Sequence, residues 1–290
     1  MNETLIDLSE KIDKPVRDIL GYIASAASSI GCPFFVVGAT ALDIILSYGY
    51  DISNNRSTQD IDFGIQVPDW DSFEQLKQKL IETGNFERDI TQVQRLSFRR
   101  NIPIDVIPFG EIANRDQLIS WPPNHNIQMS TIGFKEAYQN SINIKLREKP
   151  ALYVKFASLP GLALLKIFAW DDIPDRNKDA KDLALIIRKY LDAGNEERLF
   201  EEAIELVDKD YDYETAGARL LGRDIAKFLK FETTNAILEI LDRETSRKSN
   251  YKLARDMIDK RGFFEDIDAS IETNLNLIKE LKYGILDISS

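Results

Sequence analysis

Hydrophobic residues follow two different periods along the chain, and the change between them falls near residue 158. Before that point, short apolar runs alternate with amphipathic segments, a pattern that predicts buried strands beside helices. After it, apolar residues recur at helical spacing to the last residues, which predicts an all-helical segment. The pattern therefore indicates an α+β domain over residues 1–158, followed by a helical domain over residues 159–290.

The same periods place the elements of the first domain. We expect helices at 3–13, 15–30, 41–48, 70–83 and 133–140, and strands at 33–37, 60–67, 94–99, 102–108, 142–147 and 151–157. The strands at 94–99 and 102–108 are expected to pair in an antiparallel manner around Arg100-Asn101. Pro103 and Pro108 suit the edge or end of a strand, because proline has no N–H to give to a neighbouring strand.

Three carboxylates lie in two of these strands. Asp60 and Asp62 are two residues apart, so their side chains leave the strand on the same face. Asp105 lies in the later strand, between apolar neighbours. An Asp-x-Asp pair alone is more often solvated surface charge, but unpaired carboxylates in partly buried segments are costly. Three acids from neighbouring strands would suit a hard cation such as Mg²⁺.

Composition narrows the classes of site and partner. The single Cys32 and the single His125 exclude a disulfide within the chain and leave too few ligands for zinc, so oxygen must hold any metal. A net charge of −11 argues against a general nucleic-acid binder. Two small basic clusters are interpreted as solvated surface: Arg95, Arg99, Arg100 and Lys145, Arg147, Lys149. An acidic N-terminal segment and the lack of a long apolar run predict no signal peptide, no membrane span and a cytoplasmic location.

Several short motifs carry a family resemblance. They are the strand that ends in Gly38-Ala-Thr-Ala-Leu42, then Arg56-x-Thr58-x-Asp60-Ile-Asp62-Phe63, and then Ile104-Asp105-Val106. This set resembles the DNA polymerase β-like nucleotidyltransferase superfamily. In the helical half, Lys166 and the run from Arg176 to Leu183 are similar to motifs of the AbiEii-type nucleotidyltransferase toxins of bacterial toxin–antitoxin and abortive-infection systems. That family usually has Gly-Gly or Gly-Ser where this chain has Gly38-Ala39.

The resemblance implies a fold and a reaction. The fold would be a polymerase β-like catalytic domain, with a mixed sheet flanked by helices, and a helical domain that contributes Lys166 and the helix at 176–182 to the active site. The reaction would move a nucleoside monophosphate from a nucleoside triphosphate to RNA, such as the 3′ end of a tRNA. A cognate antitoxin protein would restrain the enzyme.

The resemblance also implies roles for individual residues. Asp60, Asp62 and Asp105 would hold two Mg²⁺ ions, and Asp105 would help to deprotonate the acceptor hydroxyl. Residues that would bind the triphosphate are Gly38, Ala39, Thr40, Arg56, Thr58 and Arg176. Lys166 would neutralise charge on the triphosphate, and Asp182 with Arg176 would orient Lys166 or the acceptor.

Alternatives remain open. In one alternative, the acceptor is a small molecule, such as an aminoglycoside-type antibiotic, or a protein hydroxyl. The acidic net charge suits a cationic drug. A second alternative is a catalytically degenerate domain kept as a regulatory binding module, against which the intact set Asp60, Asp62, Asp105 and Lys166 argues. The acids and bases of 176–182, taken alone, suit a solvated helix face. The sequence does not identify the nucleoside triphosphate.

Overall fold

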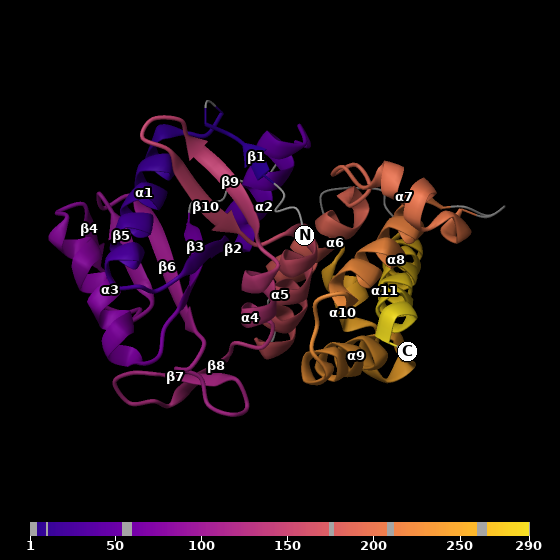
Figure 1. Cartoon of the computed structure of the whole chain (residues 1–290). Helices are drawn as coiled ribbons and strands as arrows, with labels where there is room; N and C mark the ends of the chain where they lie inside the picture. Colours follow the sequence, from indigo (N-terminus) through magenta and orange to yellow (C-terminus); the bar gives the residue numbers. More distant parts are fainter. Residues whose placement is uncertain are drawn as a thin grey trace. The chain divides into compact units, whose positions relative to one another are not determined.

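The computed structural model describes residues 5–9, 11–53, 60–173, 177–207, 212–259 and 266–289 of the chain. Contacts divide the chain into two compact units, Met1–Ser158 and Leu159–Ser290, and each is described by itself (Figure 1). The first unit combines a mixed sheet with helices, and the second is helical. The expected α+β class is therefore confirmed.

The first unit is built on an eight-stranded sheet in the order β1-β9-β10-β2-β3-β6-β5-β4. Its strands are β1 (Leu5–Asp7), β2 (Phe34–Val37), β3 (Ile61–Gln66), β4 (Phe86–Arg88), β5 (Arg95–Phe98), β6 (Ile102–Phe109), β9 (Ile142–Arg147) and β10 (Leu152–Phe156). A separate hairpin consists of β7 (Leu118–Trp121) and β8 (Ile127–Ser130). The helices are α1 (Lys14–Ser29), α2 (Gly38–Asp43) with its π-helical continuation η1 (Ile44–Gly49), α3 (Trp70–Glu82) and α4 (Phe134–Gln139).

Helices pack on both faces of this sheet. On one face, the ring of Tyr22 in α1 lies 6.1 Å from that of Phe98 in β5. On the other face, Phe134 in α4 meets Phe35 in β2 edge to face, with 6.3 Å between ring centroids. Because side chains alternate between faces along a strand, the buried β2, β3 and β6 present apolar residues to both layers. This packing fixes the register of the central strands.

The first residues differ from the prediction. A helix was expected at 3–13, but Leu5–Asp7 forms strand β1, which pairs in parallel with β9. The edge of β9 offers backbone hydrogen-bond partners to this segment, and a short helix has little stability of its own. Pairing with the sheet therefore outweighs the amphipathic pattern.

Strand β6 lies inside the sheet but carries two prolines. Pro103 pairs with Ser97 of β5 and lies before the first residue of β6 that pairs with β3. Pro108 pairs with Ile65 of β3 and lies beyond the last pair with β5. Each proline thus stands where the strand has a single neighbour, which agrees with the expectation of a local edge.

The described residues of the second unit form helices. They are α5 (Leu159–Asp172), α6 (Asn177–Lys189), α7 (Glu196–Glu202), η2 (Ile204–Leu206), α8 (Tyr213–Ala226), α9 (Phe231–Thr245), η3 (Arg247–Ser249), α10 (Lys252–Asp256) and α11 (Ile267–Ser289). Helices α8 and α11 cross very closely, because a Cβ at Gly222 would lie 2.1 Å from the Leu281 carbonyl oxygen. Glycine at this crossing allows the two backbones to touch.

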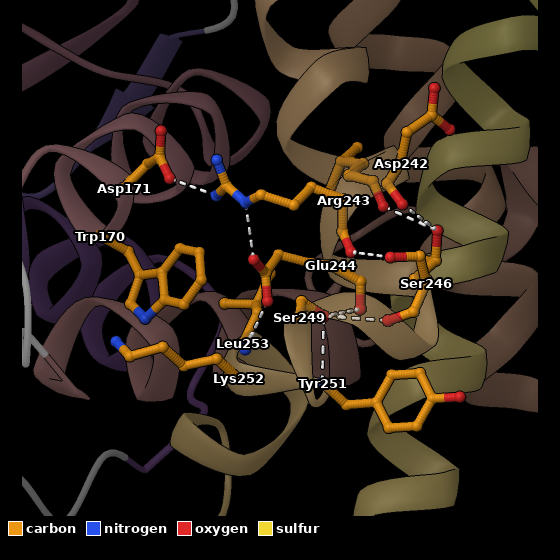
Figure 2. Close-up of polar contacts among 12 residues, drawn as sticks. Trp170, Asp171, Asp242, Arg243, Glu244, Ser246, Ser249, Tyr251, Lys252 and Leu253 are labelled. Atoms are coloured by element: carbon orange, nitrogen blue, oxygen red, sulfur yellow. Dashed lines mark hydrogen bonds and ion pairs between the residues drawn. The ribbon is translucent and has the colours of Figure 1, made fainter.

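A buried glutamate organises the turn between α9 and α10 (Figure 2). Glu244 accepts hydrogen bonds from the Leu253 backbone N–H at 3.1 Å and from Arg243 Nε at 2.9 Å. Arg243 also binds Asp171 at the end of α5. These contacts tie α5, α9 and α10 together within the helical unit.

Candidate active site

Four residues lie side by side across neighbouring strands of the first unit. Val37 of β2 pairs with Asp62 of β3, Asp62 pairs with Asp105 of β6, and Asp105 pairs with Arg95 of β5. Paired residues of a sheet point to the same face, so one row carries two carboxylates and a guanidinium. Asp60 lies two residues before Asp62, directly before the first residue of the same strand.

The three predicted acids come together at this row. One ligand oxygen from each of Asp60, Asp62 and Asp105 lies within 4.8 Å of the others, and all three residues are half-buried. Carboxylates this close repel one another unless a cation lies between or beside them. The three carboxylates therefore favour the presence of a cation at this site.

Gly38 leaves room for the Asp62 carboxylate. It begins α2 directly after β2 with a φ of +71°, and a Cβ at this position would lie 2.1 Å from Asp62 Oδ2. A side chain is thus excluded twice, by the left-handed backbone and by the neighbouring oxygen. The residues predicted to form a turn, Gly38-Ala39-Thr40, are the first turn of α2 itself, so the helix begins directly after the buried strand β2 and three residues earlier than predicted.

Thr40 holds the strand that carries the first acid. The residue is 8% exposed, and its hydroxyl donates a hydrogen bond of 2.5 Å to the Asp60 carbonyl oxygen. The family resemblance assigned this hydroxyl to a phosphate, and that role stays a prediction. In the structure the hydroxyl binds the backbone at Asp60, so Thr40 helps to hold Asp60 in position.

Arg95 was interpreted as solvated surface, but it is part of the acidic row. Its Nε donates to Asp105 Oδ1 at 2.7 Å and its Nη2 donates to Asp105 Oδ2 at 2.6 Å. Such forked, charge-assisted pairs are among the stronger hydrogen bonds in proteins. The bonds to Asp105 raise the pKa of Arg95 above its ordinary value, against the effect of burial and with help from the charges of Asp105 and Asp60. Arg95 is thus a permanent cation beside the three acids.

The residues present fit a hard divalent cation. Mg²⁺ takes oxygen ligands at about 2.0–2.1 Å in an octahedron, which puts two oxygens on one ion about 3–4 Å apart. The oxygens of Asp60, Asp62 and Asp105 lie within 4.8 Å of one another, near this spacing, so these residues would hold one such ion or two that share ligands. No softer ligand is among them, which disfavours zinc.

In the helical unit, Lys166 is surrounded by acids. The side chain of this α5 residue is 9% exposed, and its ammonium lies 2.7 Å from Asp179 Oδ1 and 2.7 Å from Asp182 Oδ2 of α6. Both acids are buried, so the alternative of a solvated helix face is wrong for these two residues. Asp179 was not among the predicted site residues, although its spacing from Asp182 placed both on one helix face. The part that Lys166 plays in binding a nucleotide stays a prediction.

Three predicted site residues, Arg56, Thr58 and Arg176, lie outside the described residues. Their roles stay predictions. Among the described helices, none is long and apolar enough to cross a membrane.

A glycine turn after a buried strand, next to paired strands that carry clustered carboxylates, suits a metal-dependent nucleotidyltransferase. A family model agrees: the model for the nucleotidyl transferase AbiEii toxin of type IV toxin–antitoxin systems matches residues 23–272. The chain belongs to this family, as its motifs predicted. It is therefore a transferase.

Solved structures with distant similarity include enzymes of two kinds. ANT(2″)-Ia in complex with adenylyl-2″-tobramycin is 16% identical, over 64% of this chain and 99% of that one, with a TM-score of 0.36. A CCA-adding enzyme in apo form II is 16% identical, over 95% and 72% of the two chains, with a TM-score of 0.32. The Thermotoga maritima CCA-adding enzyme complexed with tRNA is 12% identical, over 98% and 85%, with a TM-score of 0.26. Among curated proteins, none matches the chain significantly.

Proposed function

We propose that this protein transfers a nucleoside monophosphate from a nucleoside triphosphate to a hydroxyl of RNA, and that it acts as the toxin of a toxin–antitoxin pair. The observation that carries the reaction is the meeting of Asp60, Asp62 and Asp105 beside Gly38. The family match supports the toxin role, and the RNA acceptor, with a tRNA 3′ end as the first candidate, is carried over from the family resemblance. A cognate antitoxin is the partner that this proposal requires.

In the proposed reaction, the acceptor oxygen forms a bond to the α-phosphorus of the triphosphate. The bond from the α-phosphorus to the oxygen that bridges to the β-phosphorus breaks, and pyrophosphate leaves. Divalent cations bound at the site would neutralise the phosphates and make the attacking hydroxyl more acidic. Asp105 would help to remove the hydroxyl proton.

The other residues of the catalytic unit hold this arrangement in place. Thr40 fixes Asp60 through the backbone, and Arg95 holds the carboxylate of Asp105. Backbone N–H groups of the turn that contains Gly38 and Ala39 would receive the β- and γ-phosphates.

The proposal includes a residue of the helical unit. Lys166 would neutralise charge on the triphosphate, with Asp182 and Arg176 orienting it. The contacts of its ammonium with Asp179 and Asp182 support a fixed position for this charge.

One local feature of the helical unit favours RNA as the acceptor. Residues 243–255 contain five basic residues and one acidic residue, in a chain with a net charge of −11, and two of the five, Arg243 and Lys252, form ion pairs with Asp171 and Asp256. Arg247 and Lys248 are exposed, and neither forms an ion pair with another described residue. Phosphate backbones bind such clusters by releasing counterions. The acidic charge of the whole chain favours the competing candidate, a cationic acceptor such as an aminoglycoside.

Separate incubations test the reaction and its acceptor. The wild-type protein receives labelled nucleoside triphosphates, one at a time, with total RNA, an aminoglycoside or a protein mixture. Label is expected in RNA and is expected to disappear with Asp60→Ala and with Asp62→Ala. Asp116→Ala, which changes an exposed acid of a loop, is the control. Full transfer by Asp60→Ala or by Asp62→Ala would refute the proposed site. If label appears in the aminoglycoside alone, the acceptor is the drug and not RNA.

A further inference from the structure

Arg95 contacts Asp105, one of the three candidate metal ligands, and this contact bears on how the site binds a cation. It lies in β5 directly opposite Asp105, and its two hydrogen bonds occupy both carboxylate oxygens. The Arg95 side chain is 25% exposed and that of Asp105 is 14% exposed, so water competes weakly for the pair. The contact belongs to the acidic row itself.

The geometry of this contact is specific to arginine. A guanidinium presents two parallel N–H groups that match the two oxygens of a carboxylate, whereas a lysine ammonium is a point charge on a flexible chain. The fork therefore fixes the plane of the Asp105 carboxylate as well as compensating its charge. Each oxygen of Asp105 keeps a second lone pair for another partner.

The backbone around Arg95 is itself held by hydrogen bonds. Its N–H donates to the Gln92 carbonyl at 3.0 Å, and its carbonyl accepts from the Asp89 N–H at 3.2 Å. The Asp89 carboxylate closes the same turn by accepting from the N–H groups of Thr91 at 2.7 Å and Gln92 at 2.9 Å. Hydrogen bonds thus hold the backbone from which the Arg95 side chain extends, as a positioning role requires.

We propose that Arg95 is a positioning residue for the divalent cation. By fixing the carboxylate plane of Asp105, it directs the remaining lone pairs toward the ions that Asp60 and Asp62 hold. This inference rests on the proposed function, because it assumes that the three acids bind metal. It predicts that the shape of the guanidinium, and not only its charge, determines metal affinity.

The test measures metal binding without any nucleotide. Mn²⁺ is titrated into the wild-type protein, Arg95→Lys and Arg95→Gln, and free Mn²⁺ is followed by electron paramagnetic resonance. Loss of an outer residue that orients a ligand typically weakens metal binding about 10–100-fold, and we expect a loss of this size in both variants. Arg88→Lys is the matched control, because Arg88 lies in the neighbouring strand β4 and binds Glu74 at 2.6 Å; it is expected to bind Mn²⁺ as the wild type does.

Different results refute different claims. Wild-type affinity in Arg95→Lys would overturn the positioning role, because charge alone would then suffice. Tighter binding in Arg95→Lys and Arg95→Gln would also overturn it, because Arg95 would then compete with the cation. If the wild-type protein binds no Mn²⁺, or if Asp62→Asn binds it unchanged, the proposed metal site itself fails. Circular dichroism and the unfolding temperature identify any variant that does not fold, and Arg95→Lys, the smaller change, then decides alone.

Discussion

Gly38 lies so close to Asp62 that the carboxylate fills the space a side chain at position 38 would need. Gly38→Ala must therefore displace Asp62, and a misplacement of about 1 Å at a reacting centre can cost about 100-fold in rate. We expect a loss of transfer and of Mn²⁺ binding of about that order. Both are measured at equal protein concentration, together with the unfolding temperature.

A second glycine separates this steric effect from backbone strain. Gly31 has a φ of +67° and no atom within 4 Å of its ideal Cβ, so Gly31→Ala carries the strain alone. Strain of this kind costs about 1–3 kcal/mol of stability. Equal losses of activity in Gly31→Ala and Gly38→Ala would contradict the role assigned to the Asp62 contact.

Substitutions of Thr40 test how strongly the position of Asp60 affects nucleotide transfer. Thr40→Val keeps the shape of the side chain but removes the hydroxyl that donates to the Asp60 carbonyl. Leaving this carbonyl without its partner costs about 1–3 kcal/mol, and we expect a clear fall in kcat for nucleotide transfer. Thr40→Ser keeps the donor and is expected to retain most of the activity. If Thr40→Val transfers nucleotide at the wild-type rate, the hydroxyl does not position the site.

The buried cluster around Lys166 makes a prediction about stability. Lys166→Met leaves Asp179 and Asp182 in the protein interior without their ammonium, and breaking a buried pair in this way costs about 3–5 kcal/mol. Denaturant unfolding measures the loss. Lys181→Met, in the same helix but with a side chain that is 36% exposed, is the control and should change stability little.

Further substitutions added to Lys166→Met distinguish a structural role of Lys166 from a role in nucleotide binding. Adding Asp179→Asn and Asp182→Asn to Lys166→Met removes the buried charges that have lost their ammonium, so much of the lost stability should return. Nucleotide binding, measured by calorimetry, should not return if the ammonium contacts the triphosphate. Recovery of both would assign Lys166 a purely structural role.

Asp224 links the stability of the helical unit to pH. Burial alone would raise the pKa of this carboxyl, but hydrogen bonds from Arg198, Lys227 and Tyr190 hold it below its ordinary value. A depressed pKa stabilises the folded state above the unfolded pKa of about 3.9, and this stabilisation is lost as the pH falls through the folded pKa. Asp224→Asn should therefore lower the free energy of unfolding at pH 7, and the difference from the wild type should narrow below about pH 4. A difference that stays constant between pH 7 and pH 3 would contradict this assignment.

The central strands were predictable because their signals are local. The apolar runs of β2, β3 and β6 stand between polar or turn-forming residues in the sequence, and Gly38 follows β2 directly. Strand β1 was not predictable in this way. Its partner β9 lies far along the chain, and three residues carry too little periodicity to outweigh an amphipathic pattern.

The site residues also differ in whether their signals are local in the sequence. The acids were found because an i, i+2 pair on a strand has one geometric meaning. Arg95 could also have been found, since a turn at 99–101 places Phe98 opposite Ile102 and therefore Arg95 opposite Asp105. The partner of the Thr40 hydroxyl could not, because a backbone carbonyl twenty residues away leaves no trace in residue types.

The row from Val37 through Asp62 and Asp105 to Arg95 takes one residue from each of four strands. A slip of any strand by one residue would turn its member of the row to the opposite face. The positions of the metal ligands thus depend on strand pairing, and metal affinity reports whether the chain has folded in the correct register. A misfolded form with native secondary-structure content but a shifted strand would be recognised by its failure to bind Mn²⁺.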